Sequence, residues 1–272
     1  MEPPKRILDC GPADFAAMGG ADLLRSIRRS EGRTVLCEVL WPAPPRVDGT
    51  TNAELAVAFG ADLVLLNKFD GAEDLSGLKG RLGRPVGVNV EPSEAVPPHR
   101  QASRENLERL KGLDFVVVTA NPDAEVGTGK MAEAAALARE VLPGVPVFVG
   151  KMHGSGGRGL LGAGEVSRLA AASDAVLLPA PGTVPGSRES VVSELVGAAQ
   201  EAGALAVATV GTSQEGADAE TVRELALAAK RAGADVLHLG DADYGMAEPM
   251  NVLAASLAIR GRRHAYRRMA LR

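Results

Sequence analysis

The sequence has few aromatic residues and few cysteines. Only 3% of its 272 residues are aromatic, so Ala, Val, Leu and Gly must fill the core, which favours closely packed parallel strands and helices. Two cysteines, Cys10 and Cys37, provide neither a disulfide framework nor a zinc motif. We therefore expect a reduced, cytoplasmic protein.

Long apolar runs and an excess of positive charge are also missing. No run approaches the roughly 20 residues that cross a bilayer, and the first residues, MEPPKRILDCG, lack the apolar part of a secretory signal. We expect no membrane partner. Thirty Lys and Arg against 34 Asp and Glu give a net charge of −4, which disfavours a nucleic-acid partner. With 46% hydrophobic residues, the chain has the composition of a folded domain.

The sequence instead alternates regularly between short apolar runs and helical patterns. The runs start 23 to 31 residues apart, the length of one strand, two loops and a helix. They are Thr34–Glu38, Asp62–Asn67, Pro85–Asn89, Asp114–Thr119, Val145–Lys151, Asp174–Pro179, Ala204–Gly211 and Asp235–Gly240. Nearly continuous apolar strands indicate burial on both faces, and eight such units predict a closed (β/α)₈ TIM barrel.

An open, doubly wound sheet is the competing α/β fold. Its first strand would be followed by a Gly-rich nucleotide-binding turn, whereas Glu38 is followed here by VLWPAPP. We therefore predict one barrel over residues 33–272. Residues 1–32 form an N-terminal helical extension, with a helical stretch around 13–29 that flanks or closes the bottom of the barrel.

Aspartates begin four of the predicted strands: Asp62, Asp114, Asp174 and Asp235. The start of a strand lies at the bottom of such a barrel, the end associated with stability. We interpret these aspartates as structural.

Chemistry is expected at the opposite end, where the carboxyl ends of the strands meet. The candidate catalytic residues there are Glu38, Lys151, His153 and Asp241. Lys151 could form a Schiff base with a carbonyl substrate, stabilise a developing oxyanion, or pair with an acid across the mouth. His153 or Glu38 could act as the base. Glu38 and Asp241 could also hold Mg²⁺ or another divalent cation, since hard cations prefer oxygen ligands.

Substrate-binding candidates follow the same strands. Gly and hydroxyl residues after the later strands suit a phosphate group: Thr183, Gly211, Thr212, Ser213 and Gly240. Amide and acidic side chains suit the hydroxyls of a sugar-like ligand: Asn67, Asn89, Glu91, Asn121 and Asp243.

Several segments carry a family resemblance: ELAVAFGADLVLLNKFD, PVGVNVEP, GKMHG, LLPAPGTVPG, TVGTSQEGAD and IRGRRHAYRRM. Together they resemble a family of uncharacterised bacterial TIM-barrel proteins often found near sugar phosphotransferase genes. Some members are labelled phosphoenolpyruvate phosphonomutase-like or haloacid dehalogenase-like. The resemblance covers roughly residues 5–272 and implies a barrel, and we transfer no activity from it.

These observations predict an enzyme that acts on a small phosphorylated, carbonyl-bearing or polyhydroxylated metabolite. Proton abstraction next to a carbonyl would make it a lyase of the aldolase type or an isomerase. A metal-dependent hydrolase and a non-enzymatic, ligand-binding regulatory protein are the alternatives. The sequence is compatible with a homo-oligomer.

Overall fold

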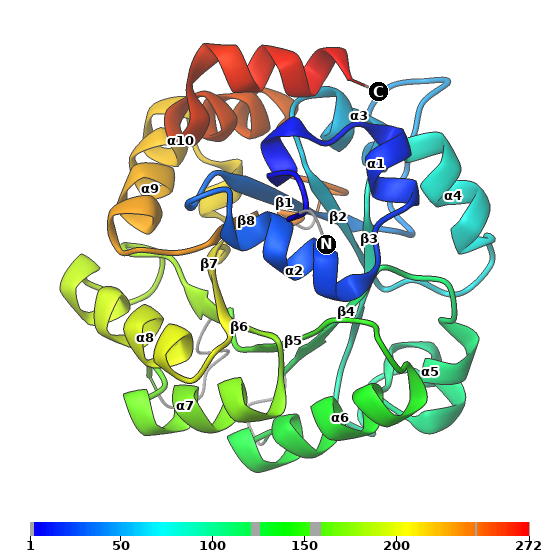
Figure 1. Cartoon of the computed structure of the whole chain (residues 1–272), viewed down its shortest axis with the longest axis vertical. Coiled ribbons are helices and arrows are strands. Elements are labelled where there is room, and N and C mark those ends of the chain that lie inside the picture. Colours follow the sequence, from blue (N-terminus) through cyan, green and yellow to red (C-terminus); the bar gives the residue numbers. More distant parts are fainter. Residues whose placement is uncertain (1–2, 121–125, 153–158, 243, 272) are drawn as a thin grey trace.

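A computed structural model describes residues 3–120, 126–152, 159–242 and 244–271. Eight parallel strands form one closed barrel in which each strand pairs with its neighbours in the sequence and β8 pairs with β1 (Figure 1). The strands are β1 (Thr34–Leu40), β2 (Leu63–Asn67), β3 (Val86–Val90), β4 (Phe115–Thr119), β5 (Val147–Gly150), β6 (Ala175–Pro179), β7 (Leu205–Val210) and β8 (Val236–Leu239). The predicted TIM barrel is confirmed.

Helices surround the barrel between the strands. They are α3 (Asn52–Ala58), α4 (Leu75–Leu82), α5 (Arg104–Arg109), α6 (Thr128–Val141), α7 (Ala163–Ala172), α8 (Glu189–Glu201), α9 (Ala219–Arg231) and α10 (Pro249–Ala270). Short 3₁₀ turns η2 (Pro98–Arg100) and η3 (Gln214–Gly216) interrupt the loops after β3 and β7. The helices cover the outward side chains of the strands, which are buried from both sides.

The interior of the barrel is packed with apolar side chains below its mouth. The rings of Phe115 and Phe148 stack with centroids 5.2 Å apart. Gly87 faces them from β3, where a Cβ atom would lie only 2.3 Å from the Phe115 ring. This combination of large and small residues fills the lower barrel with packed side chains, so no channel runs through the described part of the core.

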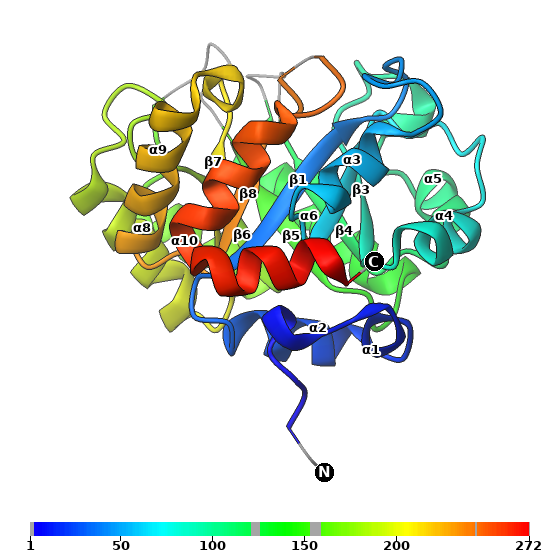
Figure 2. The ribbon, with the colours of Figure 1, turned by 90° about the horizontal axis from the view of Figure 1, so that it is seen from above.

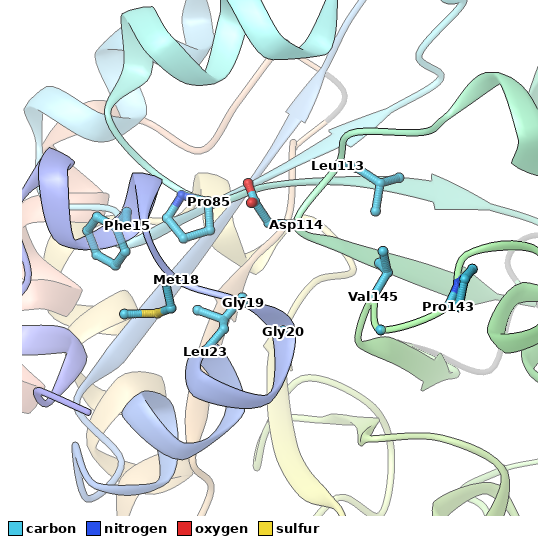
Figure 3. A pocket seen from close by; sticks show the side chains of 11 residues that line it. Phe15, Met18, Gly19, Gly20, Leu23, Pro85, Leu113, Asp114, Pro143 and Val145 are labelled. Carbon is cyan, nitrogen blue, oxygen red and sulfur yellow. The ribbon is translucent and has the colours of Figure 1, made fainter. Parts of the chain in front are cut away.

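The N-terminal extension lies across the bottom of the barrel, beside the end of α10 (Figure 2). It contains η1 (Ile7–Asp9), α1 (Pro12–Ala16) and α2 (Gly20–Arg28). Phe15, Met18 and Leu23 face the bottom loops across a pocket of about 190 Å³ (Figure 3). The bottom is therefore covered by the chain itself.

Buried charges join the extension to the barrel. Asp62, at the start of β2, pairs with Arg260 at 2.7 Å and with Arg268 at 2.6 Å. Arg268 also donates to the carbonyl oxygens of Ile7 and Cys10. One carboxylate thus links β2, α10 and the extension.

All four predicted aspartates have the same role at the bottom. Each accepts a hydrogen bond from a backbone N–H at the start of the preceding strand. The pairs are Asp62 with Val35 at 2.8 Å, Asp114 with Val86 at 2.8 Å, Asp174 with Val147 at 2.8 Å and Asp235 with Ala206 at 2.9 Å. Their structural interpretation is confirmed.

Candidate active site at the barrel mouth

A pocket of about 500 Å³ opens at the carboxyl ends of the strands. Eight of the predicted site residues line it: Glu38, Asn67, Asn89, Glu91, Gly211, Thr212, Gly240 and Asp241. The barrel brings them together because successive parallel strands end on the same rim. Five residues outside the predicted set also line it: Lys68, Arg100, Thr119, Met152 and Glu215.

Glu38 occupies the floor of this pocket. It points inward from β1, and its carboxyl Oε2 lies 3.2 Å from Nε2 of His238 on β8. The Glu38 side chain is 3% exposed and that of His238 is fully buried. Burial raises the pKa of Glu38, and the nearby imidazole only partly offsets this. Glu38 is therefore a stronger base, once ionised, than an exposed glutamate.

A chain of hydrogen bonds crosses one wall of the pocket. The Thr119 hydroxyl donates to Oδ1 of Asn89 at 2.8 Å, and Nδ2 of Asn89 lies 3.5 Å from Oδ1 of Asn67. Nδ2 of Asn67 donates to Asp241 at 2.9 Å. Four elements of the barrel thus fix the orientation of both amides before any ligand binds, which favours precise recognition of hydroxyl groups.

Glu91 is compensated by a neighbouring cation. Arg100, from η2, donates through Nε and a terminal nitrogen to Oε1 of Glu91, the first of these at 3.1 Å. The backbone reinforces the pair, because Glu91 N–H donates to the Arg100 carbonyl at 2.7 Å. The sequence did not indicate Arg100, because it lies ten residues beyond β3 in a Pro-rich loop.

Lys68 brings a second cation to the pocket. It follows β2 directly and has a φ of 57°, a left-handed conformation that is uncommon outside glycine and that concentrates at functional sites. Its charge lowers the pKa of Glu38 slightly, against the larger effect of burial. The available sequence signal was its place at a strand end, beside Asn67.

Between the loops after β7 and β8, where we predicted a phosphate group, the structure has a buried acidic side chain. Glu215, in η3, accepts a hydrogen bond from the Ala242 N–H at 3.2 Å. A Cβ atom on Gly240 would lie 2.9 Å from Oε1 of Glu215, so a larger residue there would displace the Glu215 carboxyl group. Burial raises the pKa of Glu215. The wall between the two loops therefore carries a carboxyl group that is a weaker acid than an exposed glutamate.

Two predicted phosphate ligands lie away from the pocket lining. The Thr183 side chain is buried and donates to the Ala180 carbonyl at 2.7 Å, within its own turn. Ser213 is exposed and has a φ of 74°. The Thr212 hydroxyl in turn bonds to the Thr183 carbonyl at 2.7 Å. The hydroxyls of Thr183 and Thr212 stabilise the loops in this conformation, a role that Gly-Thr-Ser composition does not distinguish from anion binding.

The loop after β5 is described only in part. Lys151 is half-buried at its start, and the pocket lining includes its neighbour Met152 but not Lys151 itself. The predicted site residues His153, Asn121 and Asp243 lie outside the described residues. Within the described ranges, no three His, Cys, Asp or Glu side chains are grouped so that they could hold a metal ion. In the same ranges, no helix is long and apolar enough to span a membrane.

Residues 8–272 match the sequence family described as a domain of unknown function, DUF7916. The chain belongs to this family. The match spans the barrel and most of the extension, so DUF7916 as represented here is one complete TIM barrel with its bottom covered. No curated protein matches the chain significantly.

Solved structures similar to this DUF7916 chain include several aldolases. The YdjI aldolase of Escherichia coli K12 has a TM-score of 0.53 at 9% identity, with 90% of this chain and 93% of that chain covered. An archaeal fructose 1,6-bisphosphate aldolase has a TM-score of 0.57 at 15% identity, with 88% and 98% covered. The deoxyribose phosphate aldolase of Aeropyrum pernix has a TM-score of 0.50 at 18% identity, with 91% and 95% covered. At these identities the similarity shows the fold.

Proposed function

We propose that this protein is an enzyme that abstracts a proton next to a carbonyl group in a small, phosphorylated or polyhydroxylated metabolite. Its outcome would be that of a lyase of the aldolase type or of an isomerase. The observation that carries the proposal is Glu38: a buried carboxyl group that lines a pocket of about 500 Å³ whose walls carry amides and cations.

Glu38 has the properties of a general base. A catalytic base works best when its pKa lies near the working pH, and burial moves the pKa of Glu38 upward from its ordinary value. The proton would pass from the substrate carbon to Glu38, and the electron pair would remain on the substrate as an enolate. Return of the proton to a neighbouring carbon, with a proton moved between the two oxygens, gives isomerisation. In the lyase case the enolate attacks the carbonyl carbon of a second molecule, whose oxygen takes up a proton. In the cleavage direction that hydroxyl loses its proton, the carbon–carbon bond breaks to release an aldehyde, and protonated Glu38 returns its proton to the enolate carbon.

The enolate oxygen needs a positive partner, and two lysines are candidates. Lys68 lines the pocket, and Lys151 starts the loop after β5. Either ammonium group would stabilise the oxyanion electrostatically. If one of them is neutral in the complex, its amine could instead form an imine with the carbonyl carbon and release water. Borohydride reduction of the protein with a carbonyl substrate separates the two roles.

The remaining pocket residues suit a sugar-like substrate. Asn67 and Asn89 present amides already held in place by Thr119 and Asp241, and hydroxyl groups can bond to them. Gly211, Thr212 and Gly240 stay the proposed phosphate contacts, and Glu215 lines the same pocket. Fructose 1,6-bisphosphate and deoxyribose phosphate appear in the names of structurally similar aldolases, which supports this substrate class.

The metal-dependent hydrolase remains a separate prediction, with Glu38 and Asp241 as the cation ligands. No observation at the mouth favours it over acid–base chemistry. The ligand-binding regulatory protein is likewise distinguished by the experiment below, because it would bind a ligand without turnover.

Hydrogen exchange tests the proposed step directly. The protein is incubated in D₂O with a panel of aldose and ketose phosphates and their unphosphorylated forms, and proton NMR follows loss of the signal next to the carbonyl. We expect exchange with at least one panel member, and Glu38→Gln should slow it by about 10²-fold or more. Exposed Glu194 on α8 provides a matched control, Glu194→Gln, which should leave the rate unchanged. Equal rates in both variants would contradict the role of Glu38.

A further inference from the structure

His238 lies 3.2 Å from the proposed base, yet it does not line the pocket. It is fully buried on β8, and the strand register pairs it with Leu36 of β1, one inward layer below Glu38. On its other side the register pairs it with Thr209 of β7. The imidazole therefore lies one layer below the pocket, next to Glu38, which lines it.

The geometry gives the two side chains complementary roles. Nε2 of His238 lies 3.2 Å from Oε2 of Glu38, close enough to share a proton, although the ring is turned away from a linear hydrogen bond. Such pairs are often poorly aligned before substrate binds. Oε1 of Glu38 has no hydrogen-bond partner among the described residues. One carboxyl oxygen is thus directed at the imidazole and the other is left available.

Unpartnered polar atoms gather around this pair. Nδ1 of His238, Oγ1 of Thr209 and Oε2 of Glu215 are also buried without partners in the described part of the chain. Each buried, unsatisfied group costs on the order of 1–3 kcal/mol. Buried polar groups without partners need a physical explanation. Their position around the proposed base supports a catalytic role here.

We propose that His238 is a positioning residue for Glu38: the two share one proton between Nε2 and Oε2, which directs Oε1 to the substrate. This inference rests on the proposed function of Glu38 as the base. Proton abstraction then adds a proton at Oε1 while His238 keeps its own, so the pair gains one positive charge as the enolate gains one negative charge.

Charged groups from neighbouring elements surround the pair. Asp241 and Lys68 face Glu38 with opposite effects on its carboxyl group, and Glu215 faces the imidazole. Cys37 lies next to Glu38 in β1, but burial raises the pKa of its thiol to about 12, so it stays neutral. The neighbouring strands β1 and β8 hold His238 at its short distance from Glu38.

The pairing can be read without any substrate. In protein with labelled glutamate carboxyl carbons, NMR follows the Glu38 signal through a pH titration. His238→Leu removes the donor that stabilises the carboxylate, so its midpoint should rise by about one pH unit, as expected for one lost charge-assisted hydrogen bond. His238→Gln places an amide N–H near the position of Nε2 and should restore most of the wild-type midpoint. Unchanged midpoints in both variants would overturn the proposal.

The imidazole provides the reciprocal measurement, which remains usable if His238→Leu does not fold. Nitrogen NMR of the histidine rings should show the His238 signals displaced in Glu38→Gln and unchanged in Glu194→Gln. Identical His238 signals in wild type and Glu38→Gln would overturn the shared proton.

Solvent exchange of a substrate then links the pair to catalysis. His238→Leu should slow exchange by on the order of 10²-fold, since small displacements of a base have effects of that size, and His238→Gln should recover much of it. If the NMR measurements show the Glu38–His238 pairing but no sugar phosphate on the panel exchanges its hydrogen, the proposed function is refuted and the pairing stands. Exchange at the wild-type rate in His238→Leu would refute the positioning role alone.

Discussion

The two ends of this barrel differ in how completely their buried acidic side chains are paired. At the bottom, Asp62 contacts two arginines and a backbone N–H, so its carboxylate has a partner on every side. At the mouth, Glu38 and Glu215 each keep a buried oxygen without a partner among the described residues. Buried acids at the bottom are neutralised within the fold, whereas those at the mouth keep oxygens that the proposed function would use. If that proposal holds, stability and function are separated along the barrel axis.

The largest expected effect of a substitution is at the bottom. Asp62→Ala leaves Arg260 and Arg268 buried without their carboxylate, which should lower the free energy of unfolding by about 3–5 kcal/mol. Asp235→Ala is the matched control, because it removes the same kind of strand-start bond without a buried arginine pair. We expect it to cost about 1–2 kcal/mol. Urea denaturation measures both, and equal losses would refute the special role of Asp62.

A substitution at the mouth should change the free energy of unfolding by less and in the opposite direction. The pKa of Glu38 is raised in the folded protein. The contribution of Glu38 to stability is therefore fully present below its unfolded pKa of about 4.5, and it is lost as pH rises through its folded pKa. Glu38→Gln cannot ionise and avoids this loss. The variant should therefore resemble wild type near pH 4 and gain stability over it as pH increases toward 8. A variant less stable than wild type at pH 8 would contradict this prediction.

The smallest change in stability is expected for a substitution at the exposed edge of the bottom. The pKa of Asp14 is lowered by the Gly11 N–H and then by Lys5, so its contribution is present above the unfolded value near 3.8 and disappears as pH falls through the folded pKa. Asp14→Asn should cost about 0.5 kcal/mol at pH 7 and nothing near pH 2. Exposed Asp48 offers the control variant Asp48→Asn, and thermal unfolding at both pH values compares them. A loss that persists at low pH would point to packing instead of charge.

The fold was predictable because its signals are local and repeated. Apolar runs mark each strand to within a few residues, and the four aspartates mark the bottom because a strand start needs a nearby acceptor for its first N–H. The rim followed from the same rule: Asn67 and Asn89 lie at or next to the ends of β2 and β3. Glu38 was predicted at the end of its strand, but β1 continues to Leu40, so Glu38 lies one inward layer deeper.

The rest of the site depends on tertiary structure that the sequence does not show. Glu215 and Arg100 reach the pocket from short 3₁₀ turns, whose direction depends on long-range packing. Thr212 and Ser213 both have positive φ, a conformation that their residue types do not favour. His238 offered a usable signal, since it lies two residues before Gly240 on an inward-facing alternation. The alternation predicts that the His238 side chain is buried next to the rim, but it does not show that Glu38 is its partner.

The bonds from Arg268 to Ile7 and Cys10 join residues 261 and 258 positions apart. Arg268 must therefore be synthesised before it can bind these two N-terminal carbonyl groups, after most of the barrel has been made. Contacts this distant in sequence form slowly, so we expect the bonds between the extension and α10 to be among the last to form during folding.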